Sequence, residues 1–540
     1  MFAALRSGSS SVSRDQAIQG ALFGLAGSVT AELVFAQFAN SMSASSSLGR
    51  ISVCALSLYI LHRFAVSSFR SYKPTMKDLS AITIVLMVAI CVVGAGRLLG
   101  LSLANYLQNS HAFAGVRPDS FEFAIPFAAG GLLLQAVFGM QYGAVFGMAL
   151  ATIETLYNPD HPLFGPYALV SVLVSCLSLS TFRSRSAYLR AGVKISFISL
   201  PFAIASVLID ANLHASDVII RVAGALASGV FSAVLAAGFI PLLEHLGGYV
   251  TDLRLIEMAT LDHPLLKELS VQCPGTWNHS MVMGMMVEAA ADAIKANPVL
   301  SRVGAYFHDI GKIKKPIYFV ENQQGEENRH DKLSSSMSAL IIRSHVKDGL
   351  ELAEKHGLPI KITDMIPQHH GTSKIEFFYD QACKEAEEAG EDPTTVDVNL
   401  YSYPGPKPQT REAGILMLAD GTEAASRSLQ DPSFDRIQGL VQKMINKVFA
   451  SGELDQCELT LKDLHSIAKA FTRVLSGIYH QRIAYAEPAE KVHEKKDSEE
   501  TEATTDETVE NRTSGKDKKI QPEEGEGDEE RKEDLKRLGL

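Results

Sequence analysis

Residues 79–101 read LSAITIVLMVAICVVGAGRLLGL, a run of 23 residues with a single charged side chain, Arg97. At 1.5 Å per residue, a helix of this length extends about 35 Å, and the hydrocarbon core of a bilayer is about 30 Å thick. The run is therefore predicted to cross a membrane as one helix.

Seven other apolar runs flank this one, and together they predict a membrane domain of eight spans. They are Ala17–Phe38, Ile51–Phe69, Phe121–Phe138, Tyr142–Tyr157, Phe164–Phe182, Ala191–Ile209 and Ile219–Leu243. The two runs on either side of Gln141 are short, so they can form a tight hairpin or a re-entrant pair. The first run fits an uncleaved anchor or a signal peptide, and its length and Glu32 favour the anchor.

Basic residues in the short loops predict the orientation of the spans. The loops after the second and sixth spans carry Arg63, Arg70, Lys73, Lys77, Arg183, Arg185, Arg190 and Lys194. The alternate loops carry instead Asp160, Asp210 and Asp217. With eight spans, the basic loops, the amino terminus and everything after Leu243 lie on the cytoplasmic side.

Three charged residues, Glu32, Arg97 and Glu154, fall at or near membrane depth. Such residues can mark an ion or ligand path, or can pair between helices. With so few of them, a transporter is disfavoured.

Charge is unevenly distributed along the chain. The formal net charge is -11, yet residues 1–243 hold 23 charged residues and residues 244–540 hold 88. This contrast excludes both a single soluble globule and a fully disordered chain. Residues 487–540 contain 19 acidic and 11 basic residues and no aromatic one, so they are predicted to be a disordered tail, either solvated or used for interactions. The six cysteines show no CxxC pair, which argues against a disulfide framework or a cysteine-rich zinc site.

The second half of the chain reads as helices joined by short polar loops. A helical stalk over 251–258 is expected to follow the last span. Further helices are expected at Met281–Ala296, Leu300–Ile313, Ser334–His356, Glu412–Leu429, Ser433–Ala450 and Leu459–Ala484. The predicted fold class is therefore all-α.

Histidine and aspartate residues recur on these helical segments. In chain order they are His279 at the start of a helix, the pair His308 and Asp309, then His345, the pair His369 and His370, and Asp420. Any one of them also fits an ordinary core or surface position. As a set they supply imidazole nitrogen and carboxylate oxygen, which suit divalent Mn, Fe or Zn. A carboxylate such as that of Asp309 can bridge two metals that share a hydroxide for in-line displacement at phosphorus.

These residues carry a resemblance to a known family. His279, His308, Asp309 and Asp420 follow the pattern of the HD phosphohydrolase superfamily. The longer motifs are similar to the seven-transmembrane HD family: CPGTWNHS (273–280), RVGAYFHDIGK (302–312), ENQ (321–323), HHGT (369–372) and YPGPKPQTRE (403–412). The resemblance covers about residues 48–485. It implies an all-helical HD domain and a membrane-bound bacterial phosphodiesterase that cleaves cyclic di-AMP to linear pApA.

The resemblance also implies roles for individual residues. His279, His308, Asp309 and Asp420 would bind one metal, and Asp309, His345 and His369 the other, with Mn or Fe expected. His370 would complete the second site or contact phosphate. Lys312 would face phosphate, and the loop Tyr403–Arg411 would border the nucleotide pocket, with Lys407 and Arg411 available to phosphate.

Two departures from the family pattern concern sensing and one aromatic position. Members usually carry a large extracytoplasmic domain after the first span, where this sequence has only Asn40–Arg50. Trp277 stands where a tyrosine-type aromatic is more usual. The first departure puts sensing outside the membrane in doubt, and the second leaves the ligands intact.

Several functional alternatives stay open from the sequence. Another HD phosphohydrolase would act on cyclic di-GMP or (p)ppGpp, but the Gly-Tyr-Pro signature of the HD-GYP branch is missing after His369 and His370. A non-catalytic nucleotide-binding receptor would have lost a metal ligand, and none is lost.

The predicted organisation is an anchor helix and linker (1–50), a transmembrane domain (51–243), a stalk (244–270), a cytoplasmic HD domain (271–486) and the tail (487–540). The expected partners are a cyclic dinucleotide, the lipid bilayer of the bacterial plasma membrane and a second copy of the chain, with no nucleic acid polymer.

Overall fold

The computed structural model describes residues 2–38, 43–69, 71–108, 116–178, 186–210, 214–323, 328–430 and 432–479. The regular elements within these ranges are helices, and the one bridge between extended residues joins Lys374 to Ser402. The prediction of an all-α fold is confirmed. The predicted tail, 487–540, lies outside the described residues, and the predicted domain boundaries stay predictions.

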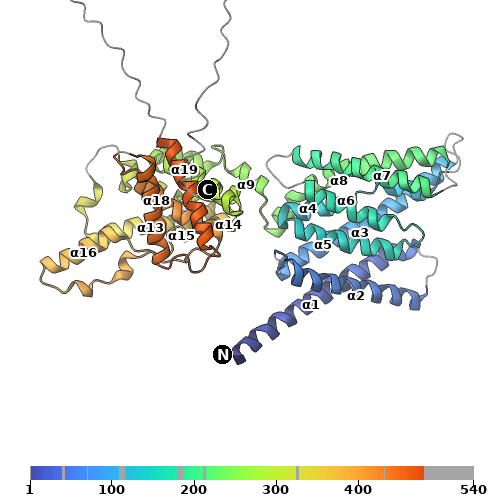
Figure 1. Ribbon diagram of the computed structural model, residues 1–540, viewed down its shortest axis with the longest axis horizontal. Coiled ribbons are helices and arrows are strands. Elements are labelled where there is room, and N and C mark those ends of the chain that lie inside the picture. The colour runs from blue at the N-terminus through green and yellow to red at the C-terminus, as the bar shows by residue number, and fades with distance from the viewer. Residues whose placement is uncertain are drawn as a thin grey trace, which may run out of the picture. The chain divides into compact units, whose positions relative to one another are not determined.

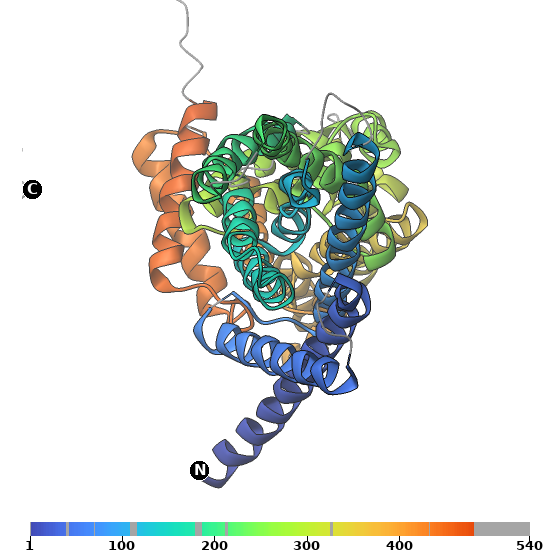
Figure 2. The ribbon, with the colours of Figure 1, turned by 90° about the vertical axis from the view of Figure 1, so that its right-hand side faces the viewer.

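Eight α-helices form the membrane part as a bundle (Figures 1 and 2). They are α1 (Phe2–Phe35), α2 (Ala44–Ser68), α3 (Met76–Gln108), α4 (Ala129–Phe138), α5 (Met140–Tyr157), α6 (Phe164–Ser178), α7 (Ser186–Ile209) and α8 (Ala215–Gly247). Six segments are long and apolar enough to cross a membrane: Arg14–Phe38, Ala44–Ser68, Met76–Gln108, Pro118–Phe138, Ser186–Ile209 and Ala215–Gly247. Helices α5 and α6 are not among these six segments. Because the structure describes α6 only to Ser178, the total of eight spans stays a prediction.

The fourth predicted span is not one continuous helix. A 3₁₀ segment, η3 (Pro118–Ala124), is followed by Pro126 and then by α4, which has only 10 residues. Ten residues rise about 15 Å, half of the hydrocarbon core. Gly139 then separates α4 from α5 with φ +94°, a conformation that favours glycine. This break agrees with the hairpin or re-entrant alternative.

The charged residues at membrane depth are paired between segments. The guanidinium of Arg97 lies 2.7 Å from Glu154 and 3.3 Å from Glu122, and Arg50 lies 2.5 Å from Glu32. A buried charge is costly unless it is paired and hydrogen-bonded. These contacts support interhelical pairing, the second of the two readings of Glu32, Arg97 and Glu154.

The second part of the chain contains eleven α-helices within its described residues. They are α9 (Asp252–Met258), α10 (Pro264–Gln272), α11 (Pro274–Ile294), α12 (Pro298–Phe307), α13 (Ser335–Lys355), α14 (Ile360–Thr363), α15 (Met365–Gln368), α16 (Glu376–Glu388), α17 (Arg411–Ser426), α18 (Phe434–Ala450) and α19 (Leu461–Tyr479). Buried side chains of α11, α17, α18 and α19 form one core cluster, and α10, α12 and the carboxyl end of α13 contribute to a second.

Two predicted helices differ from the structure next to the candidate site. Proline favours the first position of a helix, and α11 begins at Pro274, so His279 lies inside the helix and not at its start. The helix predicted to run to Ile313 ends at Phe307 and is followed by a 3₁₀ segment, η4 (Ile310–Lys314). Helix α16 was not predicted.

A close backbone approach fixes η4 against α13. A Cβ on Gly311 would lie 1.8 Å from the carbonyl oxygen of His345, so only glycine fits there. The contact brings the His308–Asp309 segment beside His345, although the two lie far apart in the sequence.

Candidate metal centre

The carboxylate of Asp309 lies at the centre of the histidine cluster. Its Oδ2 lies 3.2 Å from Nε2 of His308 and 2.7 Å from the ammonium of Lys312. Its Oδ1 lies 3.4 Å from Nε2 of His345 and 3.7 Å from Nε2 of His369. The two oxygens of this buried carboxylate therefore face different groups of imidazoles.

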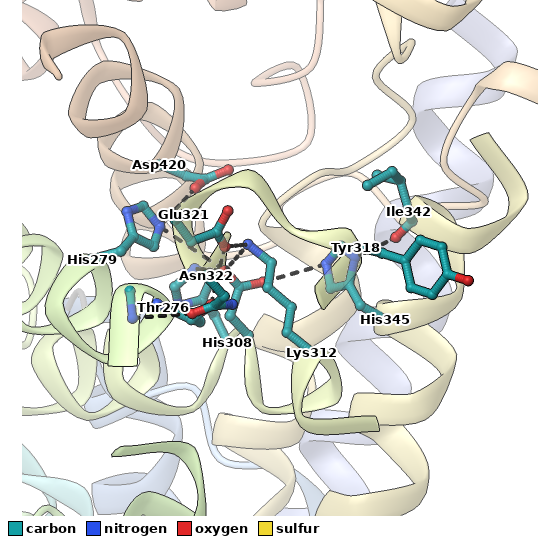
Figure 3. Close-up of polar contacts among 12 residues, drawn as sticks. Thr276, His279, His308, Lys312, Tyr318, Glu321, Asn322, Ile342, His345 and Asp420 are labelled. Atoms are coloured by element: carbon teal, nitrogen blue, oxygen red, sulfur yellow. Dashed lines mark hydrogen bonds and ion pairs between the residues drawn. The ribbon is translucent and has the colours of Figure 1, made fainter. Parts of the chain in front are cut away.

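On the Oδ2 side, α11 and α17 contribute His279 and Asp420 (Figure 3). Nε2 of His279 lies 3.1 Å from Oδ1 of Asp420 and 4.0 Å from Oδ2 of Asp309. Its Nδ1 lies 2.5 Å from Oε2 of Glu423, one turn after Asp420 on the same helix. Glu423 thus orients the ring and leaves Nε2 aimed at the two aspartates.

Three of the histidines are oriented by their own backbone. Each donates the hydrogen on Nδ1 to the carbonyl oxygen three residues earlier: His308 to Ala305 (2.7 Å), His345 to Ile342 (2.5 Å) and His369 to Ile366 (2.5 Å). A neutral imidazole that donates through Nδ1 carries its lone pair on Nε2. All three lone pairs therefore point toward Asp309.

Several atoms at the centre are buried without a hydrogen-bond partner: Nε2 of His308, His345 and His369, and Oδ1 of Asp309. Buried polar atoms are nearly always satisfied, so this concentration requires an explanation. Three groups have ligand atoms within 4.8 Å of one another: His279, His308 and Asp420; His308, Asp309 and His369; and His345, His369 and His370. Unpaired lone pairs at this spacing fit divalent cations.

The protonation states of Asp309, His345 and His369 suit metal ligands, whereas His279 has to lose a proton first. Burial lowers the pKa of His345, and it lowers that of His369 further, so both rings are neutral near pH 7. Burial opposes ionisation of Asp309, but the neighbouring His308 and Lys312 hold its pKa well below the usual range. For His279, burial is outweighed by the hydrogen bonds to Asp420 and Glu423, which raise its pKa to about 9.

His370 belongs to the group formed with His345 and His369. The sequence did not decide whether His370 binds metal or contacts phosphate. Its ring stacks on Tyr403 with centroids 4.1 Å apart, and its Nδ1 lies 3.5 Å from Oδ2 of Asp420. Burial lowers the pKa of His370 to about 3, so the ring is a neutral donor. This environment fits a metal ligand better than a phosphate contact.

Lys312 extends from η4 into the same centre. Its ammonium lies 2.7 Å from Asp309 and 2.7 Å from Oε1 of Glu321 (Figure 3). Burial would lower the pKa of Lys312, but these two carboxylates raise it, so the side chain is a cation at neutral pH. The neighbouring Asn322 accepts hydrogen bonds from the backbone of Gly275 and Thr276, which ties this segment to the start of α11.

The two cations expected on the loop before α17 are engaged elsewhere. The ammonium of Lys407 donates to the carbonyl of Gly452 at 2.9 Å. Arg411 donates to the carbonyl of Ile294 at 2.8 Å and lies 3.1 Å from Asp463. The structure brings neither of them to Asp309, and both have a structural partner.

A cavity of about 420 Å³ opens beside the centre. Its lining includes His279, Lys312, Glu321, Asp420 and Arg427. Arg427 donates to Glu423 at 2.8 Å and remains about 38% exposed, so its outer edge faces the cavity. Glu321 belongs to a motif that the sequence singled out without a role for it, whereas Glu423 and Arg427 were not predicted to belong to the site. The spacing of Glu423 and Arg427 from Asp420, three and seven residues on one helix face, is the signal that could have found both.

Two family models match the chain. Residues 21–251 match the model described as "7TM receptor with intracellular HD hydrolase", and residues 276–425 match the model described as "HD domain". The protein is thus a multi-pass membrane protein with an HD hydrolase domain, a domain type that depends on metal. These matches confirm the resemblance to the seven-transmembrane HD family.

Relatives with assigned functions match over most of this chain. A protein of Bacillus subtilis named cyclic-di-AMP phosphodiesterase PgpH is 36% identical over 387 residues, 70% of this chain and 53% of the relative. The protein of the same name from Listeria monocytogenes is 35% identical over 366 residues, 67% of this chain and 50% of the relative. The chain therefore spans about half the length of these relatives.

A crystal structure of the L. monocytogenes PgpH HD domain in complex with cyclic-di-AMP is also similar. It is 41% identical in sequence, with a TM-score of 0.38, and the match covers 41% of this chain and all of that one.

Proposed function

We propose that the protein is a membrane-anchored, metal-dependent phosphodiesterase that hydrolyses cyclic di-AMP to pApA. The observation that carries the proposal is the carboxylate of Asp309, whose two oxygens each face a separate group of imidazole Nε2 atoms. The names of the relatives, matched over about half of their length, support the choice of substrate.

The proposed ligands form two sets that share Asp309. His279, His308 and Asp420 complete one set, and His345, His369 and His370 complete the other. These donors favour Mn or Fe among the common divalent ions. When bound, two such ions would supply Lewis acidity and a hydroxide nucleophile at neutral pH.

The chain's own cations would hold the substrate phosphate. Lys312 and Arg427 line the cavity beside the centre, so a phosphodiester placed there would meet both. A planar guanidinium matches two phosphate oxygens, whereas an ammonium acts as a point charge. Lys407 and Arg411 would contribute only if substrate displaced their present partners.

The proposed location is the bacterial plasma membrane, with the HD domain in the cytoplasm. The support is the set of basic residues in the loop after the second span, which the positive-inside rule assigns to the cytoplasm. Of these, Arg63, Lys73 and Lys77 fall within described residues. Dimerisation stays a prediction.

Turnover by the full chain in detergent, loaded with Mn, tests the proposal. We expect conversion of cyclic di-AMP to pApA at a higher kcat/KM than for cyclic di-GMP. Preference for cyclic di-GMP or (p)ppGpp would assign a different HD phosphohydrolase. Binding of cyclic di-AMP without turnover would indicate a receptor.

Asp309→Ala tests the shared carboxylate. We expect loss of hydrolysis together with loss of at least one bound metal, since this substitution removes a donor from both sets. Glu354→Gln, at an exposed position on α13, serves as the matched control. Full activity of the Asp309→Ala variant would exclude the proposed arrangement.

A further inference from the structure

An apolar groove runs along α3 in the membrane part. It has a volume of about 370 Å³, which lies in the range of ligand sites. Side chains of α3, α4 and α8 line it, and its position follows from the shortness of α4. With only 10 residues, α4 cannot fill the space between two helices of 33 residues each.

The groove is open to the bilayer along its length. Ile84 and Val88 on α3 are 59% and 46% exposed, and Phe239 and Leu242 on α8 are 45% and 49% exposed, although all four line it. These side chains lie in helices that qualify as membrane spans. A lipid chain, not water, is therefore the neighbour that they would meet.

The groove is longer than one leaflet is thick. Its lining on α3 extends from Lys77 to Val93, a rise of about 24 Å. One leaflet contributes about half of the 30 Å hydrocarbon core. An acyl chain entering at the Lys77 end can thus run along α3 through the whole leaflet.

A single cation lies at one end of this otherwise apolar lining. Lys77 is exposed, and its ammonium lies 5.0 Å from the centre of the Tyr249 ring. The neighbouring Asp78 accepts hydrogen bonds from the hydroxyl of Tyr249 at 3.1 Å and from Thr75. An ammonium over an aromatic ring, at the height of the first turn of a membrane span, suits the phosphate of a lipid headgroup.

We propose that this groove binds one anionic phospholipid, with an acyl chain along α3 and the headgroup phosphate on Lys77. The site differs from the HD centre, and its binding of lipid does not depend on the proposed phosphodiesterase activity.

Tyr249 connects the lipid site to the segment that leads to α9. Its ring packs edge-on against Phe138 at the end of α4, with centroids 4.7 Å apart. It also lies two residues after the end of α8 and three before α9 begins. A phosphate on Lys77 competes with the Tyr249 ring for the same ammonium, so lipid binding changes the contacts of the segment that leads to α9.

Lipid titration of the delipidated full chain in detergent tests the proposal. We expect dioleoyl phosphatidylglycerol to bind at least fivefold more tightly than dioleoyl phosphatidylcholine, measured by native mass spectrometry, since one lysine near an anionic lipid contributes about that factor. Lys77→Gln should remove the preference. Lys73→Gln, four residues earlier, exposed and outside the groove lining, should keep it.

Two further measurements separate the contribution of the headgroup to lipid binding from that of the groove. Ile84→Trp places a larger side chain in the exposed wall of the groove, so it should weaken the binding of both lipids at this site. In the unsubstituted chain, phosphatidylglycerol should change hydrogen exchange at residues 248–255, and in Lys77→Gln it should not. Equal binding of the two lipids, or a preference retained by Lys77→Gln, would overturn the proposal. Binding without any change in exchange would overturn the link through Tyr249.

Discussion

Nδ1 of His279 and Oε2 of Glu423 lie 2.5 Å apart, although 144 positions separate the two residues in the sequence. The contact sets which nitrogen of His279 faces Asp309 and Asp420. We predict that Glu423→Gln lowers the affinity for Mn by about 10- to 100-fold, the usual cost of losing a residue that orients a metal ligand. Metal titration of the purified chain, with Glu354→Gln as control, measures it. Unchanged affinity would show that His279 is held by other contacts.

Metal affinity should rise with pH. The pKa of His279 is raised to about 9, so below that pH its proton must leave before Nε2 can bind a cation. His345, His369 and His370 have lowered pKa values, and they are already neutral at pH 7. We therefore expect the affinity for Mn to increase about tenfold per pH unit between pH 7 and 8, with release of one proton.

Calorimetry of Mn binding in two buffers of different ionisation enthalpy would count that proton. An affinity that stays flat between pH 7 and 8 would contradict a protonated His279 in the metal-free protein.

Lys312 and Lys407 should differ in their effect on catalysis. We predict that Lys312→Met lowers kcat by about 10²- to 10³-fold with metal content retained, because a cation facing a developing phosphate charge is lost. Lys407→Met should change kcat by less than about tenfold, since its ammonium binds the Gly452 carbonyl. Turnover of cyclic di-AMP and metal analysis of both variants provide the comparison. An equal loss of kcat in the two variants would indicate that Lys407 also contacts the substrate.

Gly311 should tolerate no side chain. A Cβ there would overlap the carbonyl of His345, and we predict that Gly311→Ala destabilises the protein by about 1–3 kcal/mol and displaces His345. Gly439→Ala is the matched control: it lies in the interior of α18 with no atom near its Cβ, and it should stabilise by up to about 1 kcal/mol. Thermal melting and metal titration of the two variants distinguish packing from a general effect of alanine.

Much of the membrane part could be predicted because apolar runs need no partner to be recognised. The exception is the segment Phe121–Phe138, whose composition resembles a span. Pro126 and Gly139 interrupt its backbone, and apolar content does not report such breaks.

The candidate site, too, could be predicted only in part. His308 and Asp309 are adjacent, and the histidines stand out in the sequence, so a metal centre could be predicted. The roles of Glu321 and Glu423 could not be assigned in this way, because they arise from contacts with Lys312 and His279 that only the folded chain creates. Conversely, Lys407 and Arg411 are cations that could bind phosphate, but in the folded chain both donate hydrogen bonds to backbone carbonyls.

The bonds from Nδ1 of His308, His345 and His369 to carbonyls three residues earlier have a consequence for how the centre is assembled. Each ring is set by a single local turn of the backbone, so its donor atom is presented before any ion arrives. Loading then requires no rearrangement of these rings, and its speed would be limited by dehydration of the incoming ion and by its access through the cavity.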